Sequence, residues 1–181
     1  MAFKFFSYLF LLVFFQNLNA QVASDWSDFA IDTIAIGDIN HDKIVDFAFI
    51  KGTKFSDETK QWDDCEKIGC AITISFSCGL PDISFENAVT GSIENIGDID
   101  NDGFDEIVIA PSWIISCWGQ LHFYTYKKGK WKKMGLVEQN ICNNESFLTL
   151  IKKKGKNKIA VEEQVWEDGD RVTKIKILKA K

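Results

Sequence analysis

The chain is organised around the stretch Ile96-Gly97-Asp98-Ile99-Asp100-Asn101-Asp102-Gly103-Phe104-Asp105-Glu106-Ile107-Val108-Ile109-Ala110-Pro111. Its carboxylates alternate with other residues up to a glycine, and a strand-like apolar run follows. An earlier stretch has the same pattern, shifted by 60 positions: Ile36-Gly37-Asp38-Ile39-Asn40-His41-Asp42-Lys43-Ile44-Val45-Asp46-Phe47-Ala48-Phe49-Ile50. The recurrence of one acidic loop between similar apolar segments indicates an internal repeat.

The segments around the two loops are typical of β-strands. Residues 71–76 alternate apolar and polar side chains, and residues 121–126 and 131–137 flank the turn Lys128-Gly129-Lys130 as a hairpin would. Further strands are expected at 33–36, 47–50, 83–89, 92–96, 107–110, 147–151, 158–165 and 172–178. We predict an all-β fold of propeller-blade-like, repeated antiparallel sheets.

The repeat units extend over about 29–89, 90–142 and 143–181, and the third has no acidic loop. Propellers usually have four to eight blades, so these units are too few for a full propeller. A compact, incomplete stack of blades is the preferred interpretation. A sandwich-like remnant and a propeller closed by oligomerisation remain alternatives.

Residues 1–20 have the features of a signal peptide. Lys4 precedes an apolar segment over 5–15, and Ala20 offers a small residue at the cut. The apolar segment is shorter than the roughly 20 residues that a membrane-spanning helix needs, although an uncleaved anchor is the alternative. We therefore expect a secreted or periplasmic protein, with a single β-repeat domain over 21–181 and no membrane association after cleavage.

Charge is unevenly distributed along a chain whose net charge is −5. Acidic residues dominate up to Tyr126, and lysines dominate from Lys127 onward. The lysines gather at turns, where solvated lysine is ordinary, so a polyanion site is the less favoured interpretation and nucleic acid is not an expected partner.

Five cysteines remain after export, and an oxidising compartment favours their pairing. Cys117 and Cys142 lie almost symmetrically about the turn at Gly129, so a hairpin would bring them together. Cys65 and Cys70 are close enough in sequence to close a small loop. Cys78 is then expected to be the free thiol.

Oxygen-bearing side chains at alternate loop positions suit calcium, which takes six to eight oxygen ligands at about 2.3–2.6 Å. In the second loop the predicted ligands are Asp98, Asp100, Asp102, the carbonyl of Phe104, and Glu106, with Asp105 as an alternative. In the first loop they are Asp38, Asn40, Asp42, the carbonyl of Ile44, and Asp46. Lys43 stands where the second loop has Gly103, which makes the first site the weaker prediction.

Two other kinds of loop have acidic patterns similar to these, the EF-hand and the polar turn that binds no metal. An EF-hand would need a glutamate at the twelfth loop position, where this chain has Phe49 and Ile109. An ordinary polar turn without metal is the remaining alternative. Among the cations, magnesium is disfavoured because it demands strict octahedral geometry and retains its waters.

The second loop and its continuation into Ala110-Pro111 resemble the FG-GAP repeat of integrin α-subunit propellers and the related VCBS-type repeats of exported bacterial proteins. Phe29-Ala30 stands near the place where the Phe-Gly of that family would begin the first unit. The resemblance implies that each loop lies in a hairpin of a propeller blade and binds Ca²⁺.

Catalytic motifs are not evident in the sequence. It contains no Gly-x-Ser-x-Gly nucleophile motif and no glycine-rich phosphate loop. His41 and His122 are better interpreted as a loop and a strand residue than as general bases. Paired carboxylates could serve a glycoside hydrolase, but calcium binding accounts for them better.

The segment 112–118 is the candidate partner-binding site. Exposed tryptophans stack on sugars or anchor protein partners, and this segment contains Trp113 and Trp118. Core packing is the alternative for both, and for Trp62 in the polar segment 52–67. We therefore predict a non-enzymatic, calcium-binding module for protein or glycan interaction, with a small secreted or periplasmic hydrolase as the alternative.

Overall fold

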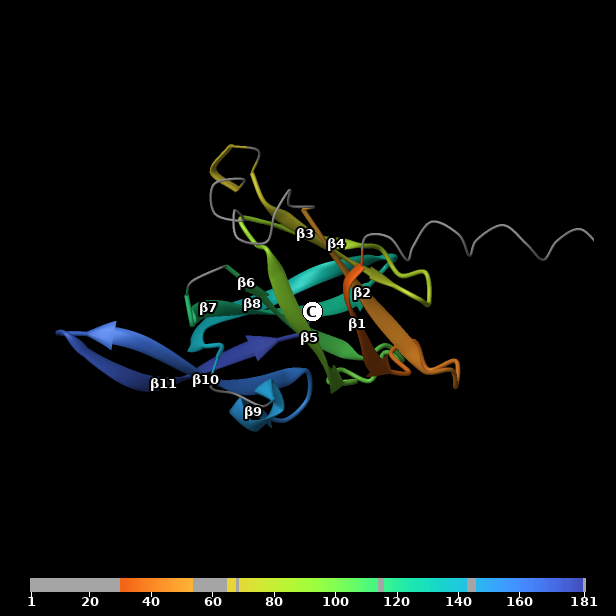
Figure 1. The fold of residues 1–181 in the computed structure, drawn as a ribbon. Coiled ribbons are helices and arrows are strands. Elements are labelled where there is room, and N and C mark those ends of the chain that lie inside the picture. Colours follow the sequence, from red (N-terminus) through yellow and green to blue (C-terminus); the bar gives the residue numbers. More distant parts are fainter. Residues whose placement is uncertain (1–29, 54–64, 68, 114–115, 143–145, 181) are drawn as a thin grey trace, which may run out of the picture.

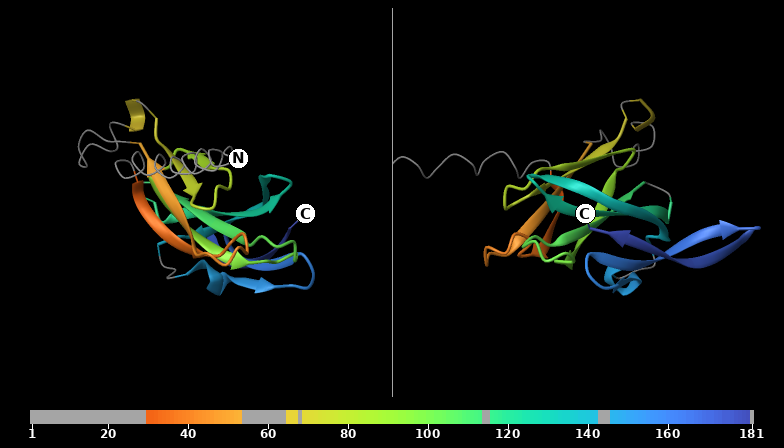
Figure 2. Two further views of the ribbon diagram at one scale, coloured as in Figure 1. Left: turned by 90° about the vertical axis from the view of Figure 1, so that its right-hand side faces the viewer. Right: turned by 180° about the vertical axis from the view of Figure 1, so that it is seen from behind.

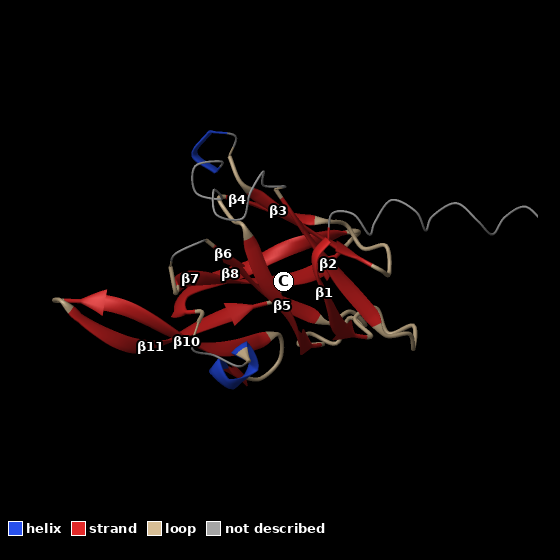
Figure 3. Cartoon of the chain, viewed as in Figure 1, coloured by secondary structure: helices blue, strands red, loops and turns tan. Residues whose placement is uncertain are grey.

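The structure, a computed structural model, describes residues 30–53, 65–67, 69–113, 116–142 and 146–180. In this part of the chain the regular structure is almost entirely β-strand, arranged in three antiparallel sheets (Figure 1, Figure 3). The all-β prediction is confirmed, as is the repeated sheet architecture. The predicted signal peptide and Trp62 lie outside the described residues.

The first two sheets have the same topology. The first has the order β1-β2-β3-β4, and the second has the order β5-β6-β7-β8. The first consists of β1 (Ala30–Gly37), β2 (Asp46–Gly52), β3 (Ala71–Phe76) and β4 (Ile83–Glu86). The second consists of β5 (Thr90–Gly97), β6 (Glu106–Ser112), β7 (Trp118–Lys127) and β8 (Lys130–Asn140). In each sheet an acidic loop joins the first strand to the second.

The entry into each acidic loop shows the repeat at the level of the backbone. The pairing of β1 with β2 shifts register just before Gly37, and the pairing of β5 with β6 shifts just before Gly97. Both glycines have positive φ, of 75° and 78°. A side chain would be strained in this conformation, so the glycine before each first aspartate allows the strand to turn into its loop.

The third sheet has only three strands, in the order β11-β10-β9. They are β9 (Ile151–Lys153), β10 (Lys158–Glu167) and β11 (Asp170–Lys179). The strand predicted over 147–151 is wrong for most of its length, because Phe147–Leu150 forms a 3₁₀ helix, η2. Ser146 caps this helix, and the Glu94 carboxylate on β5 accepts hydrogen bonds from Phe147 N and from the Ser146 hydroxyl.

The second sheet forms the middle layer of the molecule. Figure 1 and Figure 2 show it, in green to teal, between the orange-to-yellow first sheet and the blue third sheet. On β6, Ile107 and Ile109 belong to the apolar core shared with the first sheet. Val108 and Ala110 belong to the core shared with the third. Both faces of β6 are therefore buried, which explains its continuous apolar sequence.

Two disulfides join cysteines of the described segments. They are Cys65–Cys70 and Cys117–Cys142, the pairs expected from the spacing, and Cys78 is free. Disulfides persist in oxidising environments, so they indicate an extracellular or periplasmic location. A search of the helices in the described segments finds none long and apolar enough to cross a membrane.

Candidate metal centre

The loop between β5 and β6 folds around the carboxylate of Asp98. Its Oδ1 accepts hydrogen bonds from Asn101 N at 2.6 Å and Asp102 N at 3.2 Å, and its Oδ2 accepts one from Gly103 N at 3.1 Å. Asn101 and Gly103 have positive φ, of 60° and 88°, which asparagine and glycine tolerate best. The sequence of the loop thus fixes a tight turn whose N–H groups point at its first aspartate.

Three carboxylates converge in this turn. One oxygen from each of Asp98, Asp100 and Asp102 lies within 4.8 Å of the others. The side chain of Asp100 is only 1% exposed and that of Asp102 is 29% exposed. Carboxylates gathered this closely repel one another, and burial strengthens the repulsion, so the turn needs a positive charge.

Glu106, the first residue of β6, is a further predicted ligand that lies close enough to feel the Asp100 and Asp102 charges, although it is not among the three converging carboxylates. Its side chain is fully buried, and its Oε2 accepts a hydrogen bond from Ile99 N at 2.6 Å. Oε1 of Glu106 and Oδ1 of Asp100 have no hydrogen-bond donor among the described residues. Burial, with a smaller contribution from the Asp100 and Asp102 charges, raises the pKa of Glu106 to about 7 against the opposing interactions with the Thr125 hydroxyl and the Ile99 N–H.

Unpaired buried carboxylate oxygens are costly and rare in native proteins. A bound divalent cation would supply the missing partner for these oxygens and would neutralise the carboxylates around it. The donor set, which consists of carboxylates, is the type that calcium prefers. The residues of the second loop therefore fit a hard cation.

Lys127, the last residue of β7, supplies a positive charge to this cluster from the protein itself. Its Nζ lies 2.5 Å from Asp100 Oδ2 and 3.3 Å from Asp102 Oδ2. The hydrogen bond to Asp100 raises the pKa of Lys127 above that of a free lysine. A second ammonium, that of Lys153, donates to the backbone carbonyl of Asp98 at 3.2 Å. The sequence did not predict a role for Lys127 or Lys153 at this site, because both were interpreted as solvated lysines at turns.

The first loop has the same fold but a different polar arrangement. Asp38 accepts from Asp42 N at 2.9 Å and from Lys43 N at 2.7 Å, and the Asn40 amide donates to Asp42 Oδ2 at 2.9 Å. Lys43 has a φ of 74°, a strained conformation for lysine. Within the described residues, only the second loop brings three acidic groups together.

Asp46 has the place in the first loop that Glu106 has in the second. It is 2% exposed, and its Oδ2 accepts from Ile39 N at 3.0 Å. Its Oδ1 accepts a longer hydrogen bond, of 3.4 Å, from the Ser77 hydroxyl. Both oxygens of Asp46 thus have donors, unlike those of Glu106.

Ile44 and Phe104, whose carbonyls were predicted ligands, occupy equivalent positions. Ile44 N donates to Asp42 Oδ1 at 2.8 Å, and Phe104 N donates to Asp102 Oδ1 at 3.1 Å. Ile44 is 67% exposed, whereas Phe104 packs against Tyr126 with ring centroids 4.8 Å apart. The roles of their carbonyls stay predictions.

Asp105, the alternative ligand, joins the two loops instead. Its Oδ1 lies 2.8 Å from His41 Nε2, and its Oδ2 accepts from Asn95 Nδ2 at 2.7 Å. Its backbone N–H donates to Ile39 O at 2.9 Å. The hydrogen bond to Asp105 raises the pKa of His41. The two acidic loops are therefore held side by side through the His41–Asp105–Asn95 group.

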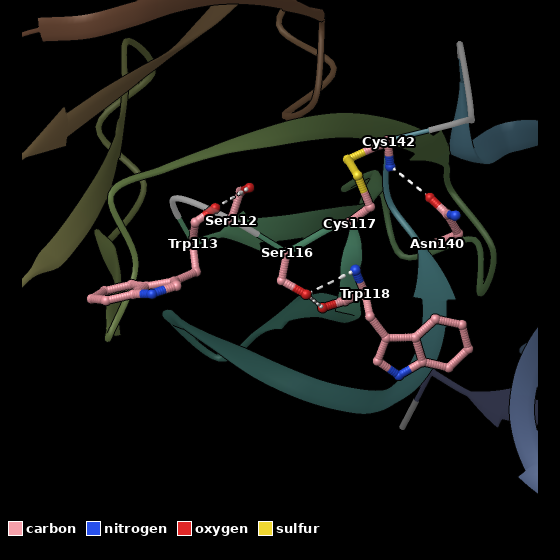
Figure 4. The surroundings of a disulfide bond; sticks show 7 residues. All are labelled: Ser112, Trp113, Ser116, Cys117, Trp118, Asn140 and Cys142. Carbon is pink, nitrogen blue, oxygen red and sulfur yellow. Dashed lines mark hydrogen bonds between the residues drawn. A yellow bond between two sulfur atoms is a disulfide. The ribbon is translucent and has the colours of Figure 1, made fainter. Parts of the chain in front are cut away.

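The two predicted partner-binding tryptophans lie at the opposite end of β6, beside the Cys117–Cys142 disulfide (Figure 4). Their rings point away from each other in this view. Trp113 packs on Cys65, Cys70 and Val89, and Trp118 stacks with Arg171, whose Cζ lies 4.9 Å from the ring centroid. Both also line a hollow of about 260 Å³ whose polar lining includes Glu86, Asn87, Gln120 and His122.

Comparison with known proteins gives no relative. The chain matches no family model, no curated protein and no solved structure.

Proposed function

We propose that this protein is an exported, non-enzymatic β-repeat module that binds calcium in its β5–β6 loop and a glycan or protein partner at its tryptophan-lined hollow. The observation that carries the calcium proposal is the cluster of Asp98, Asp100 and Asp102, in which Asp100 is buried and its Oδ1 lacks a donor. The resemblance of this loop to FG-GAP and VCBS-type repeats supports the same ion.

The side chains of Asp98, Asp100, Asp102 and Glu106 would hold the ion. Calcium would neutralise these carboxylates, so its effect is structural. The bound ion would stabilise the folded loop, because opening the loop would separate the ion from the carboxylates it neutralises. Lys127 is the competing cation. In the absence of metal its ammonium neutralises Asp100 and Asp102, and metal binding requires its release.

Thermal melting with calcium tests this proposal. A ligand that binds only the folded state stabilises it by about 2.7 kcal/mol at one hundred times its Kd. For a domain of this size that corresponds to a rise in Tm of roughly 5–10 °C. Asp100→Asn should abolish the rise, whereas the matched first-loop change Asp42→Asn should retain it.

A Tm that is unchanged by saturating calcium would reject the calcium proposal. Loss of the response in Asp42→Asn together with its retention in Asp100→Asn would move the site to the first loop. A parallel titration with magnesium distinguishes calcium from a general divalent-cation effect.

The partner proposal rests on the hollow beside Trp113 and Trp118. Aromatic faces together with amide, carboxylate and imidazole groups are the means by which proteins hold sugar rings or peptide side chains. Glycan-array binding and pulldown with the calcium-loaded protein should detect a ligand. Trp118→Ala should lose it, and Leu148→Ala, which removes an exposed apolar side chain elsewhere, should retain it.

A further inference from the structure

A second hollow lies where the β7–β8 hairpin of the second sheet meets β11 of the third. Its volume is about 530 Å³. It is lined by Thr125, Lys132, Lys133, Met134, Ile177 and Lys179. Half of these residues are lysines and none is acidic. The hollow shares no lining residue with the tryptophan-lined one.

Some lysines on the strands around this hollow have carboxylate partners. On β11, Lys176 pairs with Glu163 and Lys174 pairs with Glu167. Lys127 on β7 pairs with Asp100. By contrast, no carboxylate of the described residues forms an ion pair with any of the three lysines that line the hollow.

The strand register concentrates positive charge further. Lys158 on β10 lies directly opposite Lys179 on β11. Like charges at directly paired positions destabilise a sheet. Both lysines lie in the lysine-rich part of the chain that begins at Lys127. An anion bound beside Lys179 would reduce this repulsion.

Thr125 lines the hollow but does not offer its hydroxyl to it. The residue is 1% exposed, and its hydroxyl lies beside the Glu106 carboxylate, whose pKa it lowers. Recognition of an anion therefore rests on the three lysines. Desolvation lowers the pKa of Lys133.

We propose that this hollow binds the phosphate or sulfate group of a small monoester. Lys132, Lys133 and Lys179 would act as point charges toward the oxyanion. Met134 and Ile177 supply apolar surface for the organic part of the ester. Apart from Thr125, whose hydroxyl lies beside Glu106, the residues that line this hollow are separate from the proposed calcium loop.

The test is calorimetric titration of the full mature protein, without added calcium, at constant ionic strength. The probes are inorganic phosphate, inorganic sulfate, phenyl phosphate and phenyl sulfate. We expect saturable 1:1 binding, with each phenyl ester several-fold tighter than its inorganic ion because of the apolar wall. The relative affinities of the phosphate and sulfate probes identify which oxyanion the site prefers.

The variant Lys132→Gln/Lys133→Gln/Lys179→Gln should bind at least tenfold more weakly. The matched control Lys152→Gln/Lys154→Gln/Lys156→Gln removes the same charge from an exposed turn and should bind as the wild type does. Melting curves check that each variant is folded.

Binding that does not saturate, or that falls equally in the control triple variant, would show diffuse attraction and overturn the proposal. Equal affinity for inorganic ions and phenyl esters would show that Met134 and Ile177 do not contact the organic part of the ester.

Discussion

At the scale of single residues, Lys127 determines how readily the acidic loop can take up a metal. Its ammonium must leave Asp100 and Asp102 before a cation can enter, so part of the binding free energy of the metal is lost in breaking this ion pair. Lys127→Met should raise calcium affinity roughly tenfold, which corresponds to about 1.4 kcal/mol. It should also lower the Tm of the metal-free protein, because the acidic cluster would then be unneutralised.

Calorimetric calcium titration of the wild type and of Lys127→Met measures this effect. Lys130→Met is the control, since Lys130 lies in the same turn and is exposed. Equal affinity in all three proteins would show that Lys127 does not compete with the metal.

His122 gives the molecule a defined sensitivity to acid. Burial lowers its pKa to about 4, and its ring packs edge-on against Phe85 with centroids 4.9 Å apart. The unfolded chain, in which histidine has a pKa near 6.5, binds the proton more readily, so stability falls as the pH decreases from about 6.5 to about 4. The expected loss is about 2 kcal/mol after allowance for partial exposure.

His122→Phe should remove this loss while it keeps the aromatic contact. Glu106, whose pKa is raised to about 7, acts in the opposite direction. The folded protein binds this proton more readily than the unfolded chain, so Glu106 adds to stability as the pH falls from about 7 toward the pKa of an unfolded glutamate. The difference between urea unfolding of the wild type and of His122→Phe at pH 7 and pH 4.5 therefore isolates His122. A constant difference across this range would contradict the prediction.

Single residues also show where sequence reasoning was sufficient. The alternation of carboxylates selected the residues that gather in the second loop, because in a tight turn spacing alone brings side chains together. The role of Lys127 arises from tertiary structure. A signal was nevertheless present: Leu121, Phe123, Thr125 and Lys127 alternate along β7, so the lysine continues an inward-facing series.

At the scale of elements, the contact between the two acidic loops depends on Asn95 of β5. Its Nδ2 donates to Ile36 O at 2.9 Å and to Asp105 Oδ2 at 2.7 Å, and its Oδ1 accepts from Gly97 N at 2.7 Å. Asn95→Ala should cost about 1–3 kcal/mol, because it leaves partly buried groups without partners.

Asn95→Asp should destabilise at least as much as Asn95→Ala. It keeps the acceptor for Gly97 N but replaces the donor with a second carboxylate beside Asp105. Urea unfolding at pH 7 in calcium-free buffer measures both variants. Unfolding free energies within about 0.5 kcal/mol of the wild type would show that the contact is not required for stability.

The strands and one incorrect element show what periodicity can establish. Strands with a regular apolar alternation, such as Ala71–Phe76, agree with the prediction in position and type. The segment Phe147–Leu150 is apolar enough for a strand but forms a 3₁₀ helix, since Glu94 binds its N–H groups from a distant part of the chain. Pattern alone cannot report a partner that lies so far away in sequence.

At the scale of the whole molecule, the second sheet shares an apolar core with each of its neighbours. Ile109 is buried against the first sheet and Leu121 against the third. Ile109→Ala and Leu121→Ala should each cost about 2–5 kcal/mol. Because both cores depend on one sheet, each variant should lower a single cooperative transition, and fluorescence and circular dichroism should report the same midpoint. Two separated transitions in either variant would contradict this shared dependence.

The overall architecture could be predicted because the repeat is visible in the sequence. The recurrence of the acidic loop, followed by similar strands, implied two equivalent sheets, and the smaller third unit implied an incomplete set. The order in which the three sheets stack could not be predicted from the sequence. That order depends on which face of each strand packs against which neighbouring sheet. Because β6 is buried on both faces, its sequence has no alternation that distinguishes the two faces.

The central position of the second sheet also affects how the chain folds during its synthesis. A ribosome delivers the N-terminus first, so the residues of β1 to β4 are synthesised before any residue of the layer that covers them. The apolar face of the first sheet stays exposed to water until β5 and β6 have been synthesised. During this interval the first half of the nascent chain is vulnerable to aggregation. The interval ends only when the middle of the sequence has emerged from the ribosome.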